Sequence, residues 1–287
     1  MPELPEVETL RRSLAQTLPG RIVAGVDVRT PGTCRPSPGL QLQDVVGATA
    51  KTVRRHGKYL VVDLSNSLSL VFHLRLTGQL VLTLDSRLLA AGGHPVPEFG
   101  SPLPHKATRL VLRFADDSHL YFTDIRRFGL CLLMPTSEVP AFLQRQGLGL
   151  DVLSPEFTLD ALRDILRRRA TAKLKPLLVD QRAIAGLGNI YADEALWEAR
   201  LHPLSAAGSL TQEETARLYQ AIRDTVEYAL AHGVARVISG RAAAGREFPR
   251  AHGREGEPCP RCGHKIERIR VGGRSTYFCP VCQQPTT

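Results

Sequence analysis

The 287-residue sequence lacks any run of 18 apolar residues, which excludes a membrane-spanning helix from the expected fold. Its acidic N-terminus also lacks the hydrophobic core of a secretion signal, so we expect a cytoplasmic protein. No internal repeat is present. The chain is 43% hydrophobic and 23% charged, which is enough for packed cores, and its length indicates two domains.

Acidic residues are in deficit. There are 28 Asp and Glu against 37 Lys and Arg, a net charge of +9 and a pI of about 9.6. The residues from 236 to 287 hold ten Lys or Arg and four Asp or Glu, so +6 of that charge lies in this C-terminal segment. A basic block of this kind indicates a polyanionic partner, and it favours contact with phosphates.

Cysteine is scarce, and four of the six cysteines form the pattern C-x2-C-x16-C-x2-C. Spacing of this kind predicts a structural zinc site with four thiolate ligands. Two disulfides are the alternative, which a reducing cytosol disfavours. Cys34 and Cys131 fit no such pattern and are expected to be small buried hydrophobic residues. The predicted ligands are Cys259, Cys262, Cys279 and Cys282.

Short strands rich in Val and Leu are predicted before residue 135, and helices follow after residue 157. The expected fold class is α+β and multidomain, with an N-terminal β-sandwich behind an N-terminal helix. The expected division is a β-sandwich domain at 1–135, a linker at 136–152, a helical domain at 153–235 and a zinc finger region at 236–287. The segment Asp85 to His105 is rich in Gly and Pro and is expected to be a long loop.

The first residues of the chain carry a candidate reactive group. Val7, Leu10 and Leu14 have the spacing of one helical face, and Pro5 and Glu6 suit the first helical turn. Pro2 follows a methionine that cells remove before small residues, which would leave a secondary amine. An amine of this kind can attack an electrophilic carbon and form an iminium, with Glu3 moving the proton. The alternative is a helix start with ordinary capping carboxylates.

The opening Met-Pro-Glu-Leu-Pro-Glu-Val-Glu resembles that of the formamidopyrimidine-DNA glycosylase family, within the larger Fpg/Nei group. Further motifs that resemble the family follow in order, so the resemblance covers nearly the whole chain. It implies that Pro2 is the nucleophile at C1′ of a damaged nucleotide, that Glu3 is the acid/base and that Glu6 supports the site. It also implies a helix-two-turn-helix in the helical domain and a zinc finger built on a β-hairpin.

Other site residues are assigned through the same resemblance. Lys58 is expected to face the DNA backbone near the nucleophile, whereas spacing alone indicates a solvated lysine at a strand edge. Because an enzyme acting on a base must remove it from the stack, an apolar wedge has to fill the space. Leu76 and Phe128 are expected to be wedges, and Arg126 is expected to bind the orphaned base. The alternative for Leu76 and Phe128 is that they are core residues. Leu76 stands where the family commonly has methionine.

The motif Gly-Leu-Gly-Asn-Ile-Tyr-Ala-Asp-Glu is a glycine turn entering a helix, and such helix starts suit phosphates. The resemblance assigns Asn189 to the phosphate beside the lesion. Lys175 is a further candidate for the DNA backbone or the flipped nucleotide. Arg274 follows a Gly-Gly turn, where an arginine can hold a phosphate bidentately. An exposed turn arginine without a ligand is the alternative for Arg274.

We interpret the sequence as a monomeric bifunctional DNA glycosylase/AP lyase of base excision repair, located at the bacterial nucleoid. It is expected to bind damaged double-stranded DNA and one structural zinc ion, with no catalytic metal or organic cofactor. The expected substrates are oxidised purines, meaning formamidopyrimidines and 8-oxoguanine, released through a Schiff base on Pro2 with β,δ-elimination. A Nei-like preference for oxidised pyrimidines stays open, because Gly240 to His252 lacks the Gly-Tyr-Phe-like run of 8-oxoguanine-processing members. A non-catalytic, zinc-dependent lesion or duplex DNA-binding protein also stays open.

Overall fold

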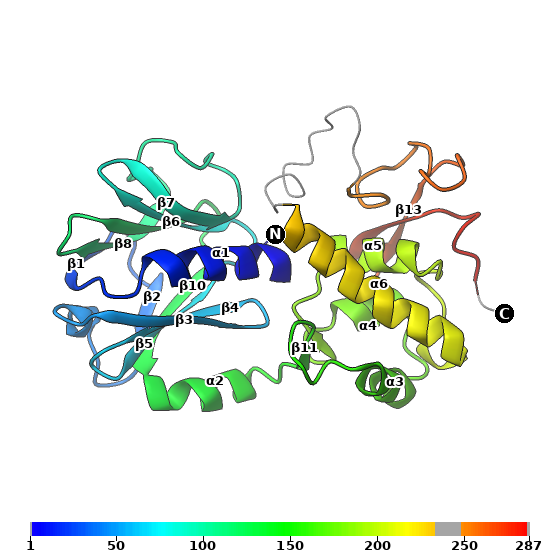
Figure 1. The fold of residues 1–287 in the computed structure, drawn as a ribbon, viewed down its shortest axis with the longest axis horizontal. Coiled ribbons are helices and arrows are strands. Elements are labelled where there is room, and N and C mark those ends of the chain that lie inside the picture. The colour runs from blue at the N-terminus through cyan, green and yellow to red at the C-terminus, as the bar shows by residue number, and fades with distance from the viewer. Residues whose placement is uncertain (1, 233–247, 286–287) are drawn as a thin grey trace. The chain divides into compact units, whose positions relative to one another are not determined.

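The structure is a computed structural model and describes residues 2–232 and 248–285 (Figure 1). The chain divides into two compact units, Met1–Gln146 and Gly147–Thr287. The first is built mainly of strands and the second mainly of helices, and the expected α+β fold is confirmed. Among the described helices, none combines the length and apolar character that a membrane span requires.

The first unit is the expected β-sandwich. One five-stranded sheet has the order β1-β8-β9-β6-β7 and the other has the order β2-β10-β5-β4-β3. Phe72 from the second sheet meets Phe122 from the first, edge to face with ring centroids 5.7 Å apart, in a core shared by both sheets. The strands are β1 Val23–Val28, β2 Cys34–Pro36, β3 Ala50–His56, β4 Tyr59–Leu64, β5 Leu68–His73, β6 Gly78–Leu84, β7 Arg87–Gly93, β8 Thr108–Phe114, β9 His119–Asp124 and β10 Leu130–Pro135.

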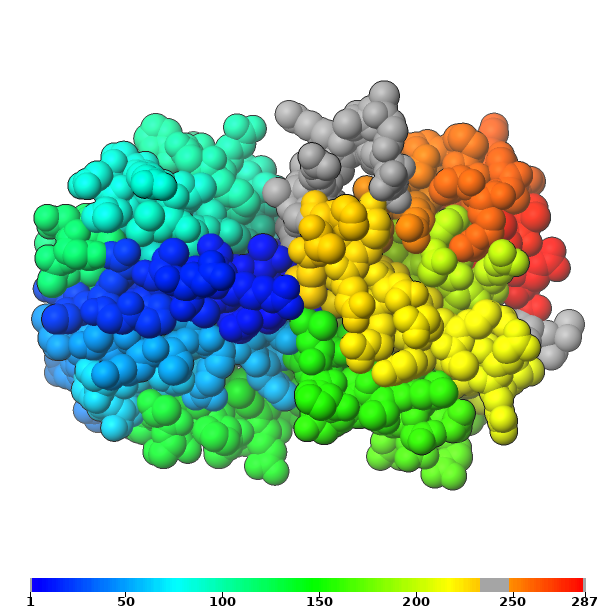
Figure 2. All heavy atoms as spheres, in the orientation of Figure 1, coloured from blue at the N-terminus to red at the C-terminus, as the bar shows by residue number. Residues whose placement is uncertain are grey.

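The N-terminal helix α1, Leu4–Thr17, packs against β7 of one sheet and β3 of the other. The expected apolar face is confirmed, because Val7, Leu10 and Leu14 are all buried. In Figure 2 the helix is the dark blue band that lies along the sandwich between the strands of the two sheets. The helix therefore covers the open side of the sandwich and packs against both sheets.

Strand β7 lies in the segment that the sequence predicts to be a loop. The pair Gly92 and Gly93 indicates a loop in the sequence, but in the structure Gly92 packs directly against Leu10 of α1. A Cβ on Gly92 would lie 2.7 Å from the Cβ of Leu10, so only glycine leaves room for the helix. The glycines serve close packing, and the expectation of a continuous loop from Asp85 to His105 is wrong for residues 87–93.

Three smaller differences from the sequence prediction occur in the first unit. The sequence predicts a strand from Val45 to Arg54, but the strand begins only at Ala50, because a 3-10 helix at Leu42–Val45 is followed by Gly47 with φ +83°. The three-residue strand β2 was not predicted. Helix α2, Val139–Arg145, occupies part of the expected linker. Cys34 and Cys131 face each other in register in the parallel β2–β10 pair and are buried as expected.

The sequence predicts helices at Leu159 to Arg169, Leu174 to Asp180, Ala192 to Ala199 and Thr211 to Ala231, and the second unit contains all four together with the β-hairpin. Helix α6 begins with a capping box in which Thr211 and Glu214 bond each other's backbone N–H groups, at 3.1 and 2.8 Å. The sequence spacing predicts a buried stripe of Leu218, Ile222 and Val226 on this helix, and all three are fully buried. The elements are β11 Leu150–Asp151, α3 Leu159–Arg168, α4 Leu174–Val179, β12 Ile184–Ala185, α5 Asn189–Glu198, α6 Gln212–Ala231, β13 Glu267–Val271 and β14 Arg274–Phe278.

The segment Gly240 to His252, on which the lesion preference was argued, lies partly outside the described residues. Only its residues 248–252 are described.

Candidate active site and nucleic-acid interface

The candidate catalytic residues lie at the start of α1. Glu3 is the N-cap of the helix, and its backbone N–H donates to Oε2 of Glu6 at 2.7 Å. Glu6 therefore fixes the peptide that carries Pro2. Pro2, Glu3 and Glu6 are all buried, with Glu3 and Glu6 each 2% exposed. Sequence reasoning placed Pro5 and Glu6 in the first turn of the helix, and they lie there.

Glu8 connects the start of α1 to the second sheet. Its carboxylate accepts hydrogen bonds from Arg11 and Arg12 at 2.8 Å and from Arg55 on β3 at 3.0 Å. Burial raises the pKa of Glu8, but the three arginines outweigh it and lower the pKa to about 2. Nη1 of Arg55 also donates to the carbonyl of Gly57 at 2.7 Å, beside Lys58. Sequence reasoning assigned no role to Glu8 or Arg55, although Glu8 lies in the opening motif.

Lys58 lies between β3 and β4 and is only 5% exposed, so it is not a solvated edge lysine. It influences His73, which pairs with Tyr59 across β4 and β5. Burial, followed by the charges of Arg75 and Lys58, lowers the pKa of His73 to about 3. A neutral imidazole thus lies near the Lys58 ammonium. Sequence reasoning missed His73, although it lies only three residues before Leu76.

Leu76, Arg126 and Phe128 lie on two adjacent loops at one end of the first unit. Leu76 is half-buried in the turn between β5 and β6, while Arg126 and Phe128 are exposed between β9 and β10. The Arg126 guanidinium lies over the Phe128 ring, 4.9 Å from its centroid. Phe128 is 53% exposed, which excludes a core position. An exposed phenylalanine stacked on a cation is a group available to a ligand.

Asn189 and Arg274, expected to bind phosphate, come together in the second unit. Asn189 is the first residue of α5, and its Nδ2 donates to the carbonyl of Ser275 at 2.8 Å. Arg274, next to Ser275, is exposed at the tip of the β13–β14 hairpin. The two-residue turn at Gly272 and Gly273 has φ +55° and +77°, which suits glycine. The Oδ1 atom of Asn189 is buried without a hydrogen-bond partner among the described residues.

Lys175 differs from its expected role. Its side chain is 1% exposed, and Nζ donates to Oδ1 of Asp193 at 2.6 Å and to the carbonyl of Asn189 at 2.7 Å. The other Asp193 oxygen lies 2.6 Å from Nδ1 of His252. The ammonium is used inside the protein to hold the first turn of α5, so this geometry does not support a direct contact with DNA.

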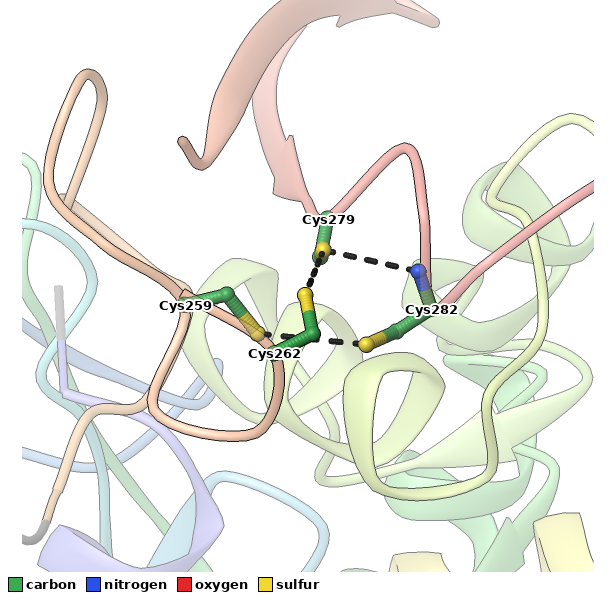
Figure 3. Close-up of side chains that lie close together, drawn as sticks. All are labelled: Cys259, Cys262, Cys279 and Cys282. Carbon is green, nitrogen blue, oxygen red and sulfur yellow. Dashed lines mark hydrogen bonds between the residues drawn. The ribbon is translucent and has the colours of Figure 1, made fainter. Parts of the chain in front are cut away.

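The four predicted cysteines form one cluster (Figure 3), with their sulfur atoms within 4.8 Å of one another. Sγ of Cys259 lies 4.0 Å from that of Cys282, and Sγ of Cys262 lies 3.5 Å from that of Cys279. Zinc–sulfur bonds of about 2.3 Å in a tetrahedron place sulfurs about 3.8 Å apart, whereas a disulfide needs about 2.05 Å. The cluster therefore fits one structural zinc and not two disulfides.

The cysteine cluster is attached to α5 through contacts that centre on Trp197. Nε1 of Trp197 lies 3.4 Å from Sγ of Cys259, and the Arg261 guanidinium lies 3.9 Å from the Trp197 ring centroid. Glu194, one turn earlier, accepts backbone N–H groups of residues 250, 251 and 252 at 2.6 to 2.8 Å. Burial raises the pKa of Glu194, against the lowering effect of these bonds. The zinc finger is thereby held against the helix that begins at Asn189.

Three family models match the chain in order. They are the formamidopyrimidine-DNA glycosylase N-terminal domain at residues 1–131, the H2TH domain of the same enzymes at 148–239, and the zinc finger found in FPG and IleRS at 256–285.

Relatives and solved structures match over the full length. The formamidopyrimidine-DNA glycosylase of Pelotomaculum thermopropionicum is 43% identical, and that of Herpetosiphon aurantiacus is 42% identical, each aligned over 99% of this chain and 99% or more of the relative. The Lactococcus lactis formamidopyrimidine-DNA glycosylase bound to DNA containing an AP site has a TM-score of 0.83 and 31% identity, covering 99% of this chain and 100% of that chain. A complex of the same Lactococcus protein with DNA containing an oxidised pyrimidine gives the same values. By domain order, full-length identity and fold, this chain belongs to the formamidopyrimidine-DNA glycosylase family.

Proposed function

We propose that the protein is a bifunctional DNA glycosylase/AP lyase that acts on oxidised bases in duplex DNA, with Pro2 as its nucleophile. The observation that carries this proposal is the start of α1, where Glu6 fixes the backbone of Glu3 and so the position of Pro2. Pro2 is buried. Once Met1 has been removed, the Pro2 nitrogen is a secondary amine, and part of it is unprotonated and nucleophilic at neutral pH.

In the proposed reaction the Pro2 nitrogen attacks C1′ of the damaged nucleotide as the C1′–base bond breaks. The base leaves with the bonding electrons and takes up a proton, and the sugar ring opens to an iminium on Pro2. Loss of a proton from C2′ then expels the 3′-phosphate, and a second elimination expels the 5′-phosphate. Glu3 exchanges these protons, and Glu6 keeps it in place. Lys58 faces the phosphate backbone near the sugar.

The proposed DNA contacts come from both units. Phe128 and Leu76 fill the space that the flipped base leaves, and Arg126 bonds the orphaned partner base. Asn189 and Arg274 hold phosphates, supported by the contact between Asn189 and the hairpin beside Arg274. For Lys175 we propose a positioning role through the first turn of α5. Zinc holds the hairpin in shape, and the chain works as a monomer with the four-part domain division predicted above.

We propose oxidised purines as the main substrates, on the strength of the opening motif and the named relatives. Oxidised pyrimidines are the second candidate, because the similar Lactococcus structure is bound to DNA with an oxidised pyrimidine. Excision from duplexes that carry 8-oxoguanine, formamidopyrimidine, thymine glycol or an abasic site separates the two. Faster release of thymine glycol than of both purine lesions would reverse the assignment.

Borohydride trapping tests the nucleophile. Reduction of the iminium should join the protein covalently to DNA with a lesion or an abasic site, and intact mass should first confirm that Met1 is absent. A chain that retains Met1 should form no adduct, and Glu3→Gln should excise poorly, while Glu98→Gln at an exposed position should behave as the wild type. An adduct that survives Met1 retention would place the nucleophile elsewhere. Absence of any nicking by the wild type, with zinc bound, would leave a non-catalytic DNA-binding protein.

A further inference from the structure

Two loops carry the groups proposed to read the opposite base, and one buried carboxylate joins them. Asp124, the last residue of β9, is 0% exposed. Its Oδ1 accepts the Thr77 hydroxyl in a short hydrogen bond, and its Oδ2 accepts the backbone N–H of Gly129 at 2.6 Å. Thr77 is adjacent to Leu76, and Gly129 is adjacent to Phe128. The carboxylate is thus bonded to both loops at once.

Arg126 completes this network through its backbone. Its N–H lies 3.0 Å from Oγ1 of Thr77 and 3.2 Å from Oδ1 of Asp124. The loop between β9 and β10 turns back sharply, with Arg127 at φ +60°. It also packs with no spare room, since a Cβ on Gly129 would lie 2.9 Å from Oδ2 of Asp124 and 2.7 Å from Cζ of Phe122. The conformation of the loop between β9 and β10 therefore depends on the position of the Asp124 carboxylate.

Asp124 is itself fixed to the sheet. Its backbone N–H donates to the carbonyl of Ala107 at 2.9 Å, and Nε of Arg109 donates to its carbonyl at 2.8 Å. A buried carboxylate accepts hydrogen bonds but donates none, so all its partners must present hydrogen atoms. Three donors from two loops meet this requirement here. A shift of either loop would take at least one of these donors away from the buried carboxylate, which is costly.

We propose that Asp124 is the positioning residue that sets the distance between the Leu76 turn and the Arg126–Phe128 loop, and so determines opposite-base discrimination. The proposal rests on the function proposed above, in which those three side chains contact the opposite base and the vacated space. Asp124 touches no substrate and acts through the backbone of the two loops. Its effect should appear when a base pair has to be opened and read, and should be small when no partner base exists.

Asp124→Asn is the sharpest test because it keeps the shape and removes one acceptor. The new amide group would have to face either the Gly129 N–H or the Thr77 side chain. If the amide NH2 faced Gly129, it would point at the Gly129 N–H, two donors would repel, and the loop between β9 and β10 would shift. Asp63→Asn is a matched control in the same unit, since Asp63 accepts side-chain bonds from Arg54, Ser69 and Thr52 on the strands and none from these loops.

Single-turnover excision should be measured with the lesion opposite C and opposite A, beside strand cleavage at an abasic site in single-stranded DNA. For Asp124→Asn we expect excision from the preferred pair to fall about tenfold or more, and the ratio between opposite bases to move toward one. Cleavage of the single strand should change less than about threefold, because no opposite base is read there. Asp63→Asn should keep the wild-type ratio.

Thr77 provides a second route if Asp124→Asn does not fold. Thr77→Ser keeps the hydroxyl and should keep the opposite-base ratio, whereas Thr77→Val removes it and should shift the ratio as Asp124→Asn does. A folded Asp124→Asn with the wild-type ratio would overturn the proposal, as would an equal shift in Asp63→Asn or in Thr77→Ser. Failure of the wild type to excise any lesion would instead refute the proposed function.

Discussion

The bonds of Glu8 allow a prediction of how much this one carboxylate stabilises the first unit, through two arginines of α1 and through Arg55 of β3. The change is Glu8→Gln, which removes the negative charge that Arg11, Arg12 and Arg55 share. Burial raises the pKa of Glu8, but the three arginines lower it by more, so that the net change is from 4.5 to about 2. A difference of about 2.5 pH units corresponds to about 3 kcal/mol at most. Since Arg11 and Arg12 are 28% and 55% exposed, solvent screening reduces this to about 2 kcal/mol.

Thermal or urea unfolding measures this loss. A destabilisation of about 2 kcal/mol should lower the Tm of a unit of this size by about 4 to 8 °C. Glu213→Gln is the control, because Glu213 is 83% exposed in its pair with Arg217 and should change stability by about 0.5 kcal/mol or less.

The pH dependence of this difference provides an independent check. The pKa of Glu8 is depressed in the folded state, so its stabilisation is fully present above pH 4.5 and is lost as pH falls toward 2. The gap in Tm between wild type and Glu8→Gln should therefore be constant from pH 5 to 8 and should shrink below pH 4.5. A gap that stays the same at pH 2.5, or one below about 1 °C at pH 7, would refute the coupling of Glu8 to the arginines.

Two further predictions concern the second unit. Removal of zinc by a strong chelator, or Cys279→Ser, should abolish DNA binding and raise proteolysis near residues 256–285, because the small hairpin depends on its metal. The control Cys34→Ser should retain one zinc per chain by metal analysis. Equal DNA affinity with and without metal would contradict this prediction. Arg274→Ala should weaken DNA binding and reduce the slope of log affinity against log salt by about one. Lys175→Gln should instead lower stability and leave that slope unchanged, because the Lys175 ammonium bonds Asp193 and not phosphate. A reduced slope for Lys175→Gln would show that Lys175 contacts DNA.

The local parts of the fold could be predicted from the sequence. The spacing of Val7, Leu10 and Leu14 gave α1, and the cysteine spacing gave the zinc ligands, because each pattern lies within a short segment and has one physical explanation. The strand over residues 87–93 was missed for the opposite reason. Gly92 has no side chain to show which face it presents, and its role appears only when Leu10 packs on it.

The same distinction between local patterns and distant contacts applies to the candidate site. Groups on recognisable motifs, such as Glu3 and Asn189, were found, and their catalytic and DNA-binding roles stay predictions. Asp124 was missed although it lies only two residues before Arg126, because its role depends on Thr77, 47 residues away. Lys175 was predicted to contact DNA, because lysines are mostly exposed and the sequence does not show that its partner is the buried Asp193.

Buried carboxylates that accept backbone N–H groups occur at three places beside groups proposed to act on DNA or to hold the zinc finger. Glu6 accepts the N–H of Glu3, Asp124 accepts that of Gly129, and Glu194 accepts those of residues 250–252 before the zinc finger. In a low-dielectric interior such bonds are short and directional, so they fix a main chain more rigidly than apolar contacts do. They also make each of these loops depend on one side chain. An isosteric amide at each carboxylate should therefore impair the neighbouring function while most of the fold persists, and unfolding of all three variants would contradict that reasoning.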